Sequence, residues 1–185
     1  MHIIVFTPEP SSKMGGQPLS TFEVCQYLAG KGHLITLLFI KEGDLLNEYK
    51  KFCVQTILIK YFDIDHKNLA KTVLLLFQQL VSACRKMSGG YGSESKILYT
   101  DTHKCCLFIY LISIFFQCPT VFHVRQPVLK PMPLKYRFGV RGMNQLIAVS
   151  RALKNSWIQD GGIKSIRGAN THVIYKRMFE KSVLK

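Results

Sequence analysis

The stretch HIIVFTPEPSSKMGGQPLSTFEVCQYLAGKGHLITLLFI, residues 2–40, decides the fold of this chain, because a strand, a glycine-bearing loop, a helix and a second strand follow one another in it. His2–Phe6 is a short apolar run of the kind found in buried parallel strands. Leu19–Leu28 carries apolar residues at helical spacing, and Gly30 and Gly32 follow it as helix-ending signals. Leu34–Ile40 is a second apolar run. The segment therefore predicts one β–α–β unit.

Gly15 and Gly16 lie in the loop between this first strand and the helix. Glycine has no Cβ, so it can adopt a positive φ and let backbone N–H groups approach a ligand closely. The free amides and the positive dipole end of the following helix favour a phosphate or another oxyanion. The loop is neither G-x-G-x-x-G nor a P-loop. It predicts an anion site, although a flexible surface turn would also account for two adjacent glycines.

Strand-type and helix-type segments alternate along the rest of the chain. The expected strands are Gln55–Ile59, Ile97–Thr100, Thr120–Val124 and Gln145–Val149; the expected helices are Lys67–Lys86, Lys104–Gln117 and Arg151–Gln159, the last ending at Gly161 and Gly162; Met87–Ser95, rich in Gly and Ser, is expected to be a loop. Such alternation predicts an α/β fold, a Rossmann-like, doubly wound parallel sheet of about six or seven strands. In this fold ligands bind at the carboxyl ends of the strands.

The chain is strongly basic. Its 185 residues include 25 Lys and Arg against 11 Asp and Glu, a formal net charge of +14. After His123 only Asp160 and Glu180 are acidic. Such a field attracts anions, and three partners fit it: a diphosphate-bearing acceptor, an anionic membrane surface, or nucleic acid. No zinc-finger spacing and no RNP-type aromatic phrase is present, so nucleic acid is not the expected partner.

The six cysteines lie mostly in apolar runs without a C-x-x-C pair, which predicts buried thiols in a reducing cytoplasm and no disulfides. The first residues form too short an apolar run for a signal peptide. The most apolar stretch, Cys105–Cys118, is shorter than the roughly 18–20 residues that cross a bilayer, which favours a helix packed against the sheet. The expected location is therefore the cytoplasm.

The segment Arg125–Met143 mixes Lys and Arg with apolar side chains beside the expected cleft. One interpretation is a cationic amphipathic element that lies on an anionic membrane, which would make the protein peripheral at the inner face of the membrane. The other interpretation is a helix half buried against the domain. The sequence leaves both open.

The carboxyl-end rule gives a short set of candidate site residues. His123 ends the fifth strand and is the candidate catalytic residue, although a strand-end histidine can equally be satisfied by a backbone carbonyl. Asp101 could act as a general base, but its position favours a cap on the following helix. The candidates for substrate binding are Gly15, Gly16, His103, Arg125 and Ser150.

Ser150 precedes a helix and is first an N-cap. No Gly-x-Ser-x-Gly elbow surrounds it, which argues against a hydrolase. The scattered His and Cys residues show no metal-ligand spacing, so no metal is expected.

Four phrases carry a resemblance to a known family. The first, MGGQPLSTFEVCQYLAGKGH, contains an L-A-x-x-G-H phrase at Leu28–His33, and the others are VFHVRQP (Val121–Pro127), LIAVSRALK (Leu146–Lys154) and HVIYK (His172–Lys176). Their order and rough spacing resemble the N-terminal half of the glycosyltransferases of family 4. The resemblance covers almost the whole chain.

The resemblance implies the GT-B fold, of which this chain would be the acceptor-side half. It implies a retaining transfer of a sugar from a nucleotide-sugar donor to a glycan or lipid-linked acceptor, in polysaccharide or glycolipid synthesis, with no metal or other cofactor. His123 would line the pocket where the sugar meets the acceptor hydroxyl. The Gly15 and Gly16 loop would stabilise the leaving diphosphate.

We expect one domain over residues 1–175, followed at 176–185 by the start of an interdomain linker or a tail. The family's donor domain carries a Glu-x7-Glu motif, which nothing after His172 supplies, so the chain alone is expected to be inactive and to need a C-terminal donor domain or a partner subunit. The alternatives are a non-catalytic subunit of a split transferase that binds the acceptor or a membrane, and an inactive remnant. Another kind of nucleotide-binding Rossmann protein would need Glu42 as its ribose-binding carboxylate.

Overall fold

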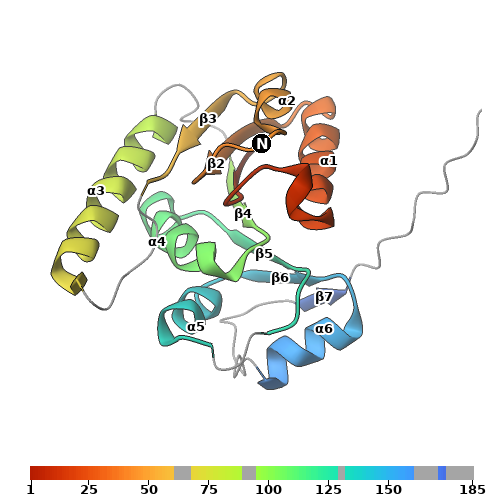
Figure 1. Ribbon diagram of the computed structural model, residues 1–185, viewed down its shortest axis with the longest axis vertical. Coiled ribbons are helices and arrows are strands. Elements are labelled where there is room, and N and C mark those ends of the chain that lie inside the picture. Colours follow the sequence, from red (N-terminus) through yellow and green to blue (C-terminus); the bar gives the residue numbers. More distant parts are fainter. Residues whose placement is uncertain (61–67, 89–94, 129–131, 161–170, 174–185) are drawn as a thin grey trace, which may run out of the picture.

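The computed structural model describes residues 1–60, 68–88, 95–128, 132–160 and 171–173. These residues form one parallel sheet of seven strands in the order β3-β2-β1-β4-β5-β6-β7, flanked by helices (Figure 1). The strands are β1 (His2–Phe6), β2 (Leu34–Phe39), β3 (Gln55–Leu58), β4 (Lys96–Thr100), β5 (Thr120–Val124), β6 (Gln145–Ala148) and β7 (Thr171–Val173). The α/β, doubly wound prediction is confirmed.

The helices of the described residues are α1 (Gly16–Gly30), α2 (Leu46–Lys50), α3 (Leu69–Ser88), α4 (Cys106–Phe116), α5 (Leu134–Arg141) and α6 (Arg151–Asn155). Short 3-10 turns precede α1 and α4, and a π-helical turn, Ser156–Asp160, follows α6.

β1 lies at the centre of the sheet because it pairs on both sides. Ile3 is opposite Ile35 in β2 and opposite Ile97 in β4. Successive side chains of a strand point to opposite faces, so an unbroken apolar run such as His2–Phe6 can be buried on both faces. All five residues of β1 are buried, as this argument requires.

The two faces of the sheet support separate hydrophobic cores. Ile3 and Val5 belong to the core under α1 and α2, which includes Tyr49. Ile4 and Phe6 belong to the larger core under α3, α4 and α5. The helices on both faces hold the carboxyl ends of the strands in one fixed edge (Figure 1).

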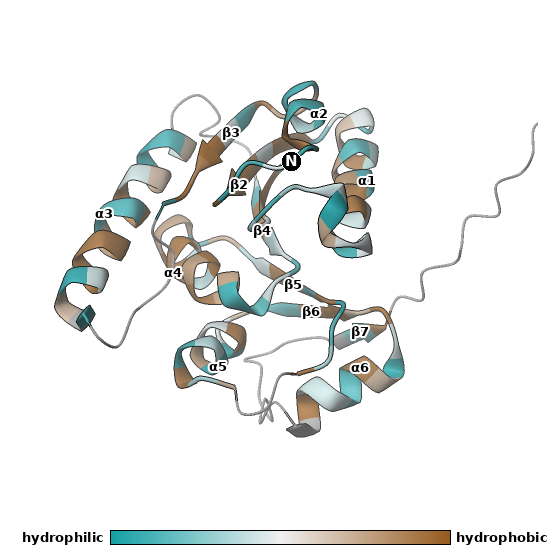
Figure 2. Cartoon of the chain, in the orientation of Figure 1, coloured by the Kyte–Doolittle hydropathy of each residue, from teal (hydrophilic) through white to brown (hydrophobic). Residues whose placement is uncertain are grey.

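Within the Cys105–Cys118 stretch lies α4, which packs against the sheet as predicted but exposes Ile114 and Phe115, and Figure 2 shows α4 as predominantly hydrophobic. Gln117 ends this helix in the left-handed conformation, with φ 50°. All six cysteines are free. None of the described helices is long and apolar enough to span a membrane.

Several element boundaries differ from the predictions. The helix expected from Leu19 begins at Gly16, because Gly15 supplies the non-helical residue before it. The helix expected over Arg151–Gln159 is α-helical only to Asn155. Met87 and Ser88, expected in a loop, end α3.

Other predictions lie outside the described residues. They are most of the Met87–Ser95 loop, the helix end at Gly161 and Gly162, the end of the strand His172–Lys176, and the domain boundary between 1–175 and 176–185.

The Arg125–Met143 segment contains the helix α5, and one of the two interpretations of this segment was a helix half buried against the domain. α5 is half buried, with Gly139 and Val140 inside the domain. A Cβ at Gly139 would lie 2.3 Å from the Leu107 backbone nitrogen, so only glycine permits this approach of α5 to α4.

Candidate functional site

A cavity of about 490 Å³ opens at the carboxyl edge of the sheet. Its wall is contributed by the segments after β1, β2 and β4, by the end of β5, by the start of α1 and by the turn after α6. Residues from these elements that carry the argument below are Gln17, Asp101, His103, Arg125 and Trp157. This is the edge at which ligands bind in doubly wound sheets.

The start of α1 faces this edge without a side-chain cap. Gly15 is the N-cap residue at φ 95°, no side chain hydrogen bonds there, and the first turn contains no acidic residue. No atom would contact a Cβ at Gly15 or Gly16 within 4 Å, so the backbone of both is open to a ligand. The cavity wall itself is formed by Met14 and Gln17, which flank the two glycines.

Arg125 connects the end of β5 to the start of α1. Its Nη1 donates to the Gln17 carbonyl oxygen at 3.3 Å, and its Nη2 donates to the Tyr99 hydroxyl at 3.5 Å. Its Nε is buried and has no hydrogen-bond partner among the described groups. The guanidinium therefore places a positive charge in the cavity wall beside the helix N-terminus.

His123 lies one contact away from the cavity wall, against Arg125. Its Nδ1 is 2.7 Å from the Tyr99 hydroxyl and 3.2 Å from Nη2 of Arg125. A guanidinium can only donate, so Nδ1 must carry a lone pair and the ring proton must be on Nε2. Burial, reinforced by the Arg125 charge, lowers the pKa of His123 to about 4. At neutral pH this histidine is a hydrogen-bond donor through Nε2.

Asp101 is buried at the end of β4 and holds α1 in place. Its carboxylate accepts from the Thr21 hydroxyl at 2.7 Å, and its backbone carbonyl accepts from Gln17 Nε2 at 2.8 Å. Burial raises the pKa of this carboxyl group, against the lowering effect of the Thr21 hydrogen bond and the Arg125 charge. The expectation that Asp101 caps the following helix is wrong: Thr102 is the N-cap residue there, with no side-chain cap.

An aromatic group closes the other side of the cavity. The His103 ring contacts Tyr136 and Trp157, with centroid distances of 5.5 and 5.9 Å. Trp157 is buried, packs against Phe122 and donates from Nε1 to the Gln126 carbonyl at 2.8 Å. Burial lowers the pKa of His103, and the nearby Lys104 lowers it further. A mostly apolar wall with a few placed polar groups is typical of small-molecule sites.

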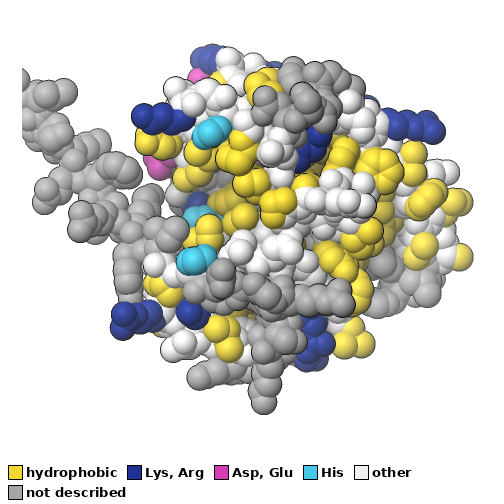
Figure 3. All heavy atoms as spheres, turned by 180° about the vertical axis from the view of Figure 1, so that it is seen from behind, with side chains coloured by type: hydrophobic (Ala, Val, Ile, Leu, Met, Phe, Trp, Pro, Cys, Tyr) yellow, Lys and Arg dark blue, Asp and Glu magenta, His cyan; other side chains and the backbone are white. Residues whose placement is uncertain are grey.

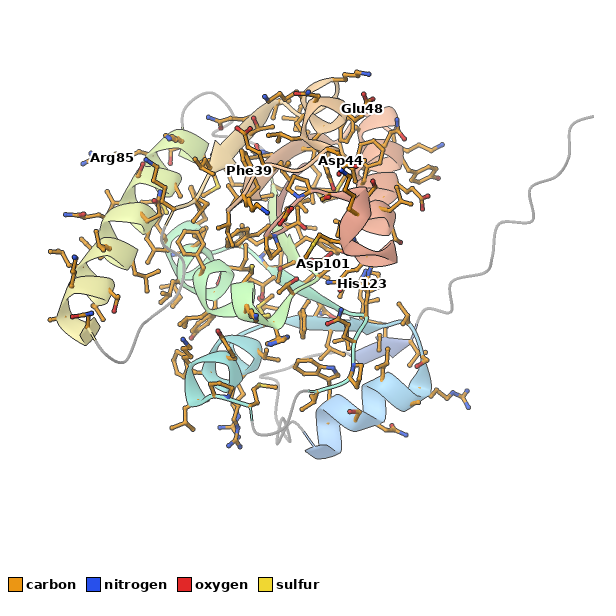
Figure 4. All side chains as sticks on the ribbon, viewed as in Figure 1. Phe39, Asp44, Glu48, Arg85, Asp101 and His123 are labelled. Atoms are coloured by element: carbon orange, nitrogen blue, oxygen red, sulfur yellow. The ribbon has the colours of Figure 1, made fainter. Side chains whose placement is uncertain are left out.

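The predicted site residues separate into those in or against the cavity wall and those outside its lining. His103 and Arg125 lie in the wall, and His123 contacts Arg125. Gly15, Gly16 and Ser150 are not among the residues that line the cavity. Figure 4 labels Asp101 and His123 close together at this edge, below α1. Ser150 caps α6 by accepting from the Leu153 N–H at 3.2 Å, which confirms the N-cap reading, and its role in substrate binding stays a prediction.

Sequence reasoning missed three contributors, Gln17, Tyr99 and Trp157. Tyr99 precedes the strand end by one residue, and it meets His123 because β4 pairs with β5. Trp157 is the single tryptophan of the chain, which was a usable signal. Among the described residues, no group of three or more His, Cys, Asp or Glu side chains could hold a metal ion.

Comparison with known proteins identifies the architecture. No protein-family model and no curated protein sequence matches the chain. Among solved structures, it is similar to Anabaena HepE in complex with UDP and glucose, with a TM-score of 0.63 and 16% identity over 95% of this chain and 44% of that one. The chain therefore spans about half the length of the structures that it matches.

Two further structures agree. Sucrose-phosphate synthase of Thermosynechococcus elongatus gives a TM-score of 0.61 at 14% identity, with 94% of this chain and 47% of that chain covered. Acinetobacter baumannii MurG gives 0.58 at 13% identity, with 82% and 42% covered. These neighbours are GT-B glycosyltransferases, so the chain has the fold of one half of a GT-B glycosyltransferase, as its sequence phrases predicted.

Proposed function

We propose that this chain is the acceptor-side domain of a retaining glycosyltransferase, which transfers a sugar from a nucleotide-sugar to a glycan or lipid-linked acceptor in polysaccharide or glycolipid synthesis. The supporting observation is the junction at Arg125. A guanidinium lies beside an uncapped helix N-terminus, in the wall of a cavity at the carboxyl edge of the sheet.

This junction suits a leaving group that gains negative charge. When the bond between the anomeric carbon and the diphosphate oxygen breaks, charge develops on the diphosphate. The N–H groups of Gly16 and Gln17 and the Arg125 guanidinium are preorganised donors for that charge. Pro18 has no N–H, so the helix start offers few amides and a complete diphosphate site needs donors from elsewhere.

His123 is proposed to act at the reacting sugar as a donor. Its Nε2–H can bind a sugar hydroxyl, whereas its Nδ1 is already occupied by Tyr99 and Arg125. Another group must then take the proton from the hydroxyl of the acceptor substrate. The reaction itself supplies such a group, the leaving diphosphate oxygen. The new bond forms on the same face of the sugar, so the configuration is retained.

Most donor contacts would come from a second domain or a partner subunit. HepE, which is matched over 44% of its length, is seen with UDP and glucose. By the proposal, the cavity of this chain closes against such a partner. The chain alone is then inactive and binds nucleotide-sugars weakly.

Calorimetric titration of the chain with a panel of nucleotide-sugars tests this proposal. The expected dissociation constants are weaker than roughly micromolar, because one helix start and one arginine make only part of the contacts. Amide chemical shifts under excess UDP-sugar should move at Gly16, Gln17 and Arg125. These shifts should disappear in Arg125→Gln and persist in Lys31→Gln, a control on the far end of α1.

Two results would overturn the proposal. Sub-micromolar binding of a nucleotide-sugar would make this chain the donor half. If nucleotide-sugar shifts amide signals of the parent chain only at residues away from the carboxyl edge, the ligand does not bind at the proposed site. Binding of glycans at the cavity without any response to nucleotide-sugars would instead support the alternative of a non-catalytic acceptor-binding subunit.

A further inference from the structure

The helices α3, α4 and α5 form one face of the molecule, and the charged residues within these three helices are all basic. No Asp or Glu occurs in the sequences of these three helices. Their cationic residues are Lys71, Arg85, Lys86, Lys135, Arg137 and Arg141. Figure 4 shows Arg85 projecting outward from α3. The face is therefore electrostatically complementary to an anionic partner.

The same face exposes large apolar side chains. Phe77 and Phe115 are 63% and 66% exposed, and Leu74 and Ile114 are each 57% exposed. Figure 3 shows hydrophobic side chains gathered on the side of the molecule that carries α3, with Lys and Arg at its margins. A contiguous apolar patch with a polar rim marks an interaction site on a folded protein.

Between α3 and α4 this patch is hollowed into a groove of about 810 Å³. Its apolar wall consists of Phe77, Leu80, Val81, Leu111, Ile114 and Phe115. The floor of the groove adjoins the core, because Leu80 and Leu111 pack against it, whereas Phe77, Ile114 and Phe115 are exposed. Packing of Tyr110 against Phe138, with centroids 5.7 Å apart, continues the face onto α5.

We infer that the α3–α4–α5 face docks this protein onto an anionic lipid bilayer. Phe77 and Phe115 enter the interface between headgroups and acyl chains, and Arg85 and Lys86 bind the acidic headgroups. The inference rests on this face alone and does not require the chain to be a transferase. It places the lipid contact on three helices, beyond the Arg125–Met143 segment that the sequence singled out.

A second copy of this chain fits the face less well. A two-fold dimer apposes the same patch from both subunits, so the cations of α3 and α5 would be brought close to their own equivalents. Like charges apposed at an interface are unfavourable, and no acidic residue of the three helices could pair with them. An anionic lipid surface carries the charge opposite to that of these helices.

Co-sedimentation with vesicles tests the inference. The chain should bind vesicles of phosphatidylcholine and phosphatidylglycerol at low salt, and binding should weaken as salt rises, because exposed charges are screened within about 8 Å at physiological ionic strength. Vesicles of phosphatidylcholine alone should bind much less. The double variant Phe77→Ser, Phe115→Ser should lose about tenfold or more in binding to the anionic vesicles, since both rings would otherwise enter the interface.

The charge variant Arg85→Glu, Lys86→Glu should also lower binding severalfold. The matched controls lie on the opposite face of the sheet: Tyr27→Ser removes an aromatic side chain that is 65% exposed on α1, and Lys31→Glu reverses a charge at the end of that helix. Both controls should bind like the parent. Circular dichroism confirms that each variant is folded, which the exposure of the replaced side chains favours.

The inference fails if the parent chain does not sediment with anionic vesicles at low salt. It also fails if the double phenylalanine variant binds as well as the parent. Sedimentation velocity tests the alternative that a second copy of the chain binds this face. If the parent chain does not bind vesicles but forms a dimer, and the double phenylalanine variant is a monomer, this face is an interface between copies.

Discussion

At the scale of single residues, the site depends on contacts between side chains far apart in the sequence. Asp101 holds Thr21, and Arg125 reaches both Gln17 and the Tyr99–His123 pair. Each contact joins a strand end to α1 or to the neighbouring strand. The proton position on His123 follows from two of these neighbours rather than from the histidine itself.

Replacing Arg125 by glutamine should raise the pKa of His123 from about 4 towards its ordinary value of about 6.5. The Arg125 charge disfavours the protonated ring, so its loss removes part of the lowering, while burial, the larger cause, keeps the rest. An NMR titration of the His123 Cε1 proton measures the change. Lys31→Gln, which removes a charge at the far end of α1, should leave the titration as in the parent.

The same shift has a consequence for stability. Because the pKa of His123 is lower in the folded chain, the unfolded chain binds more protons between about pH 4 and 6.5, and this histidine reduces stability as the pH falls through that window. Arg125→Gln should partly flatten this part of the pH dependence in urea unfolding, because one of the two causes of the lowered pKa is removed. A parent chain in which His123 titrates near 6.5 contradicts the argument.

At the scale of elements, helix α5 is fixed by its close approach to α4. A Cβ at Gly139 would meet the Leu107 backbone, which cannot rotate away as a side chain could. Gly139→Ala should therefore lower the free energy of unfolding by about 1–3 kcal/mol, the usual cost of overpacking. Urea unfolding measures this change.

Gly30→Ala is the matched control, because open space surrounds that position at the end of α1. Alanine has the higher helix propensity, so this control should be neutral or stabilising by up to about 1 kcal/mol. Equal effects of the two substitutions would show that α5 does not depend on this contact.

The elements also show what could be predicted from the sequence. Strands and helices were predictable because their hydrophobic periods are local, and so was the Ser150 cap, whose partner Leu153 is three residues away. The role of Asp101 was not predictable, because its partner Thr21 is brought to it by the pairing of β1 with β4. The sequence left open whether the α5 segment packs against the domain or lies on a membrane, because the reason for a glycine at 139 is its close approach to the backbone of Leu107, which is distant in the sequence.

At the scale of the whole molecule, the described sheet ends in β7, which pairs only with β6. Among the residues that the structure describes, the two cores are built from residues between Ile3 and Trp157. Removing residues 176–185, the expected linker or tail, should leave the melting temperature unchanged. Removing 171–185 deletes β7 as well and should lower it by several degrees, roughly 2–8 °C for a loss of 1–2 kcal/mol.

Differential scanning calorimetry of the two truncated chains distinguishes these cases. A large drop on removal of 176–185 alone would mean that the domain extends past residue 175. Equal melting temperatures for both truncations would mean that β7 contributes nothing to the sheet's stability.

The central position of β1 has a consequence for synthesis on the ribosome. β1 is translated before the other strands of the sheet, yet Ile3 pairs with Ile97, nearly a hundred residues later. At about 5–20 residues per second, one edge of this apolar strand waits roughly 5–20 s for its partner to emerge. During that interval the nascent chain presents an unpaired hydrophobic strand edge, a recognised hazard for aggregation. Chaperone supply and elongation rate between codons 40 and 100 should therefore control how much folded protein a cell recovers.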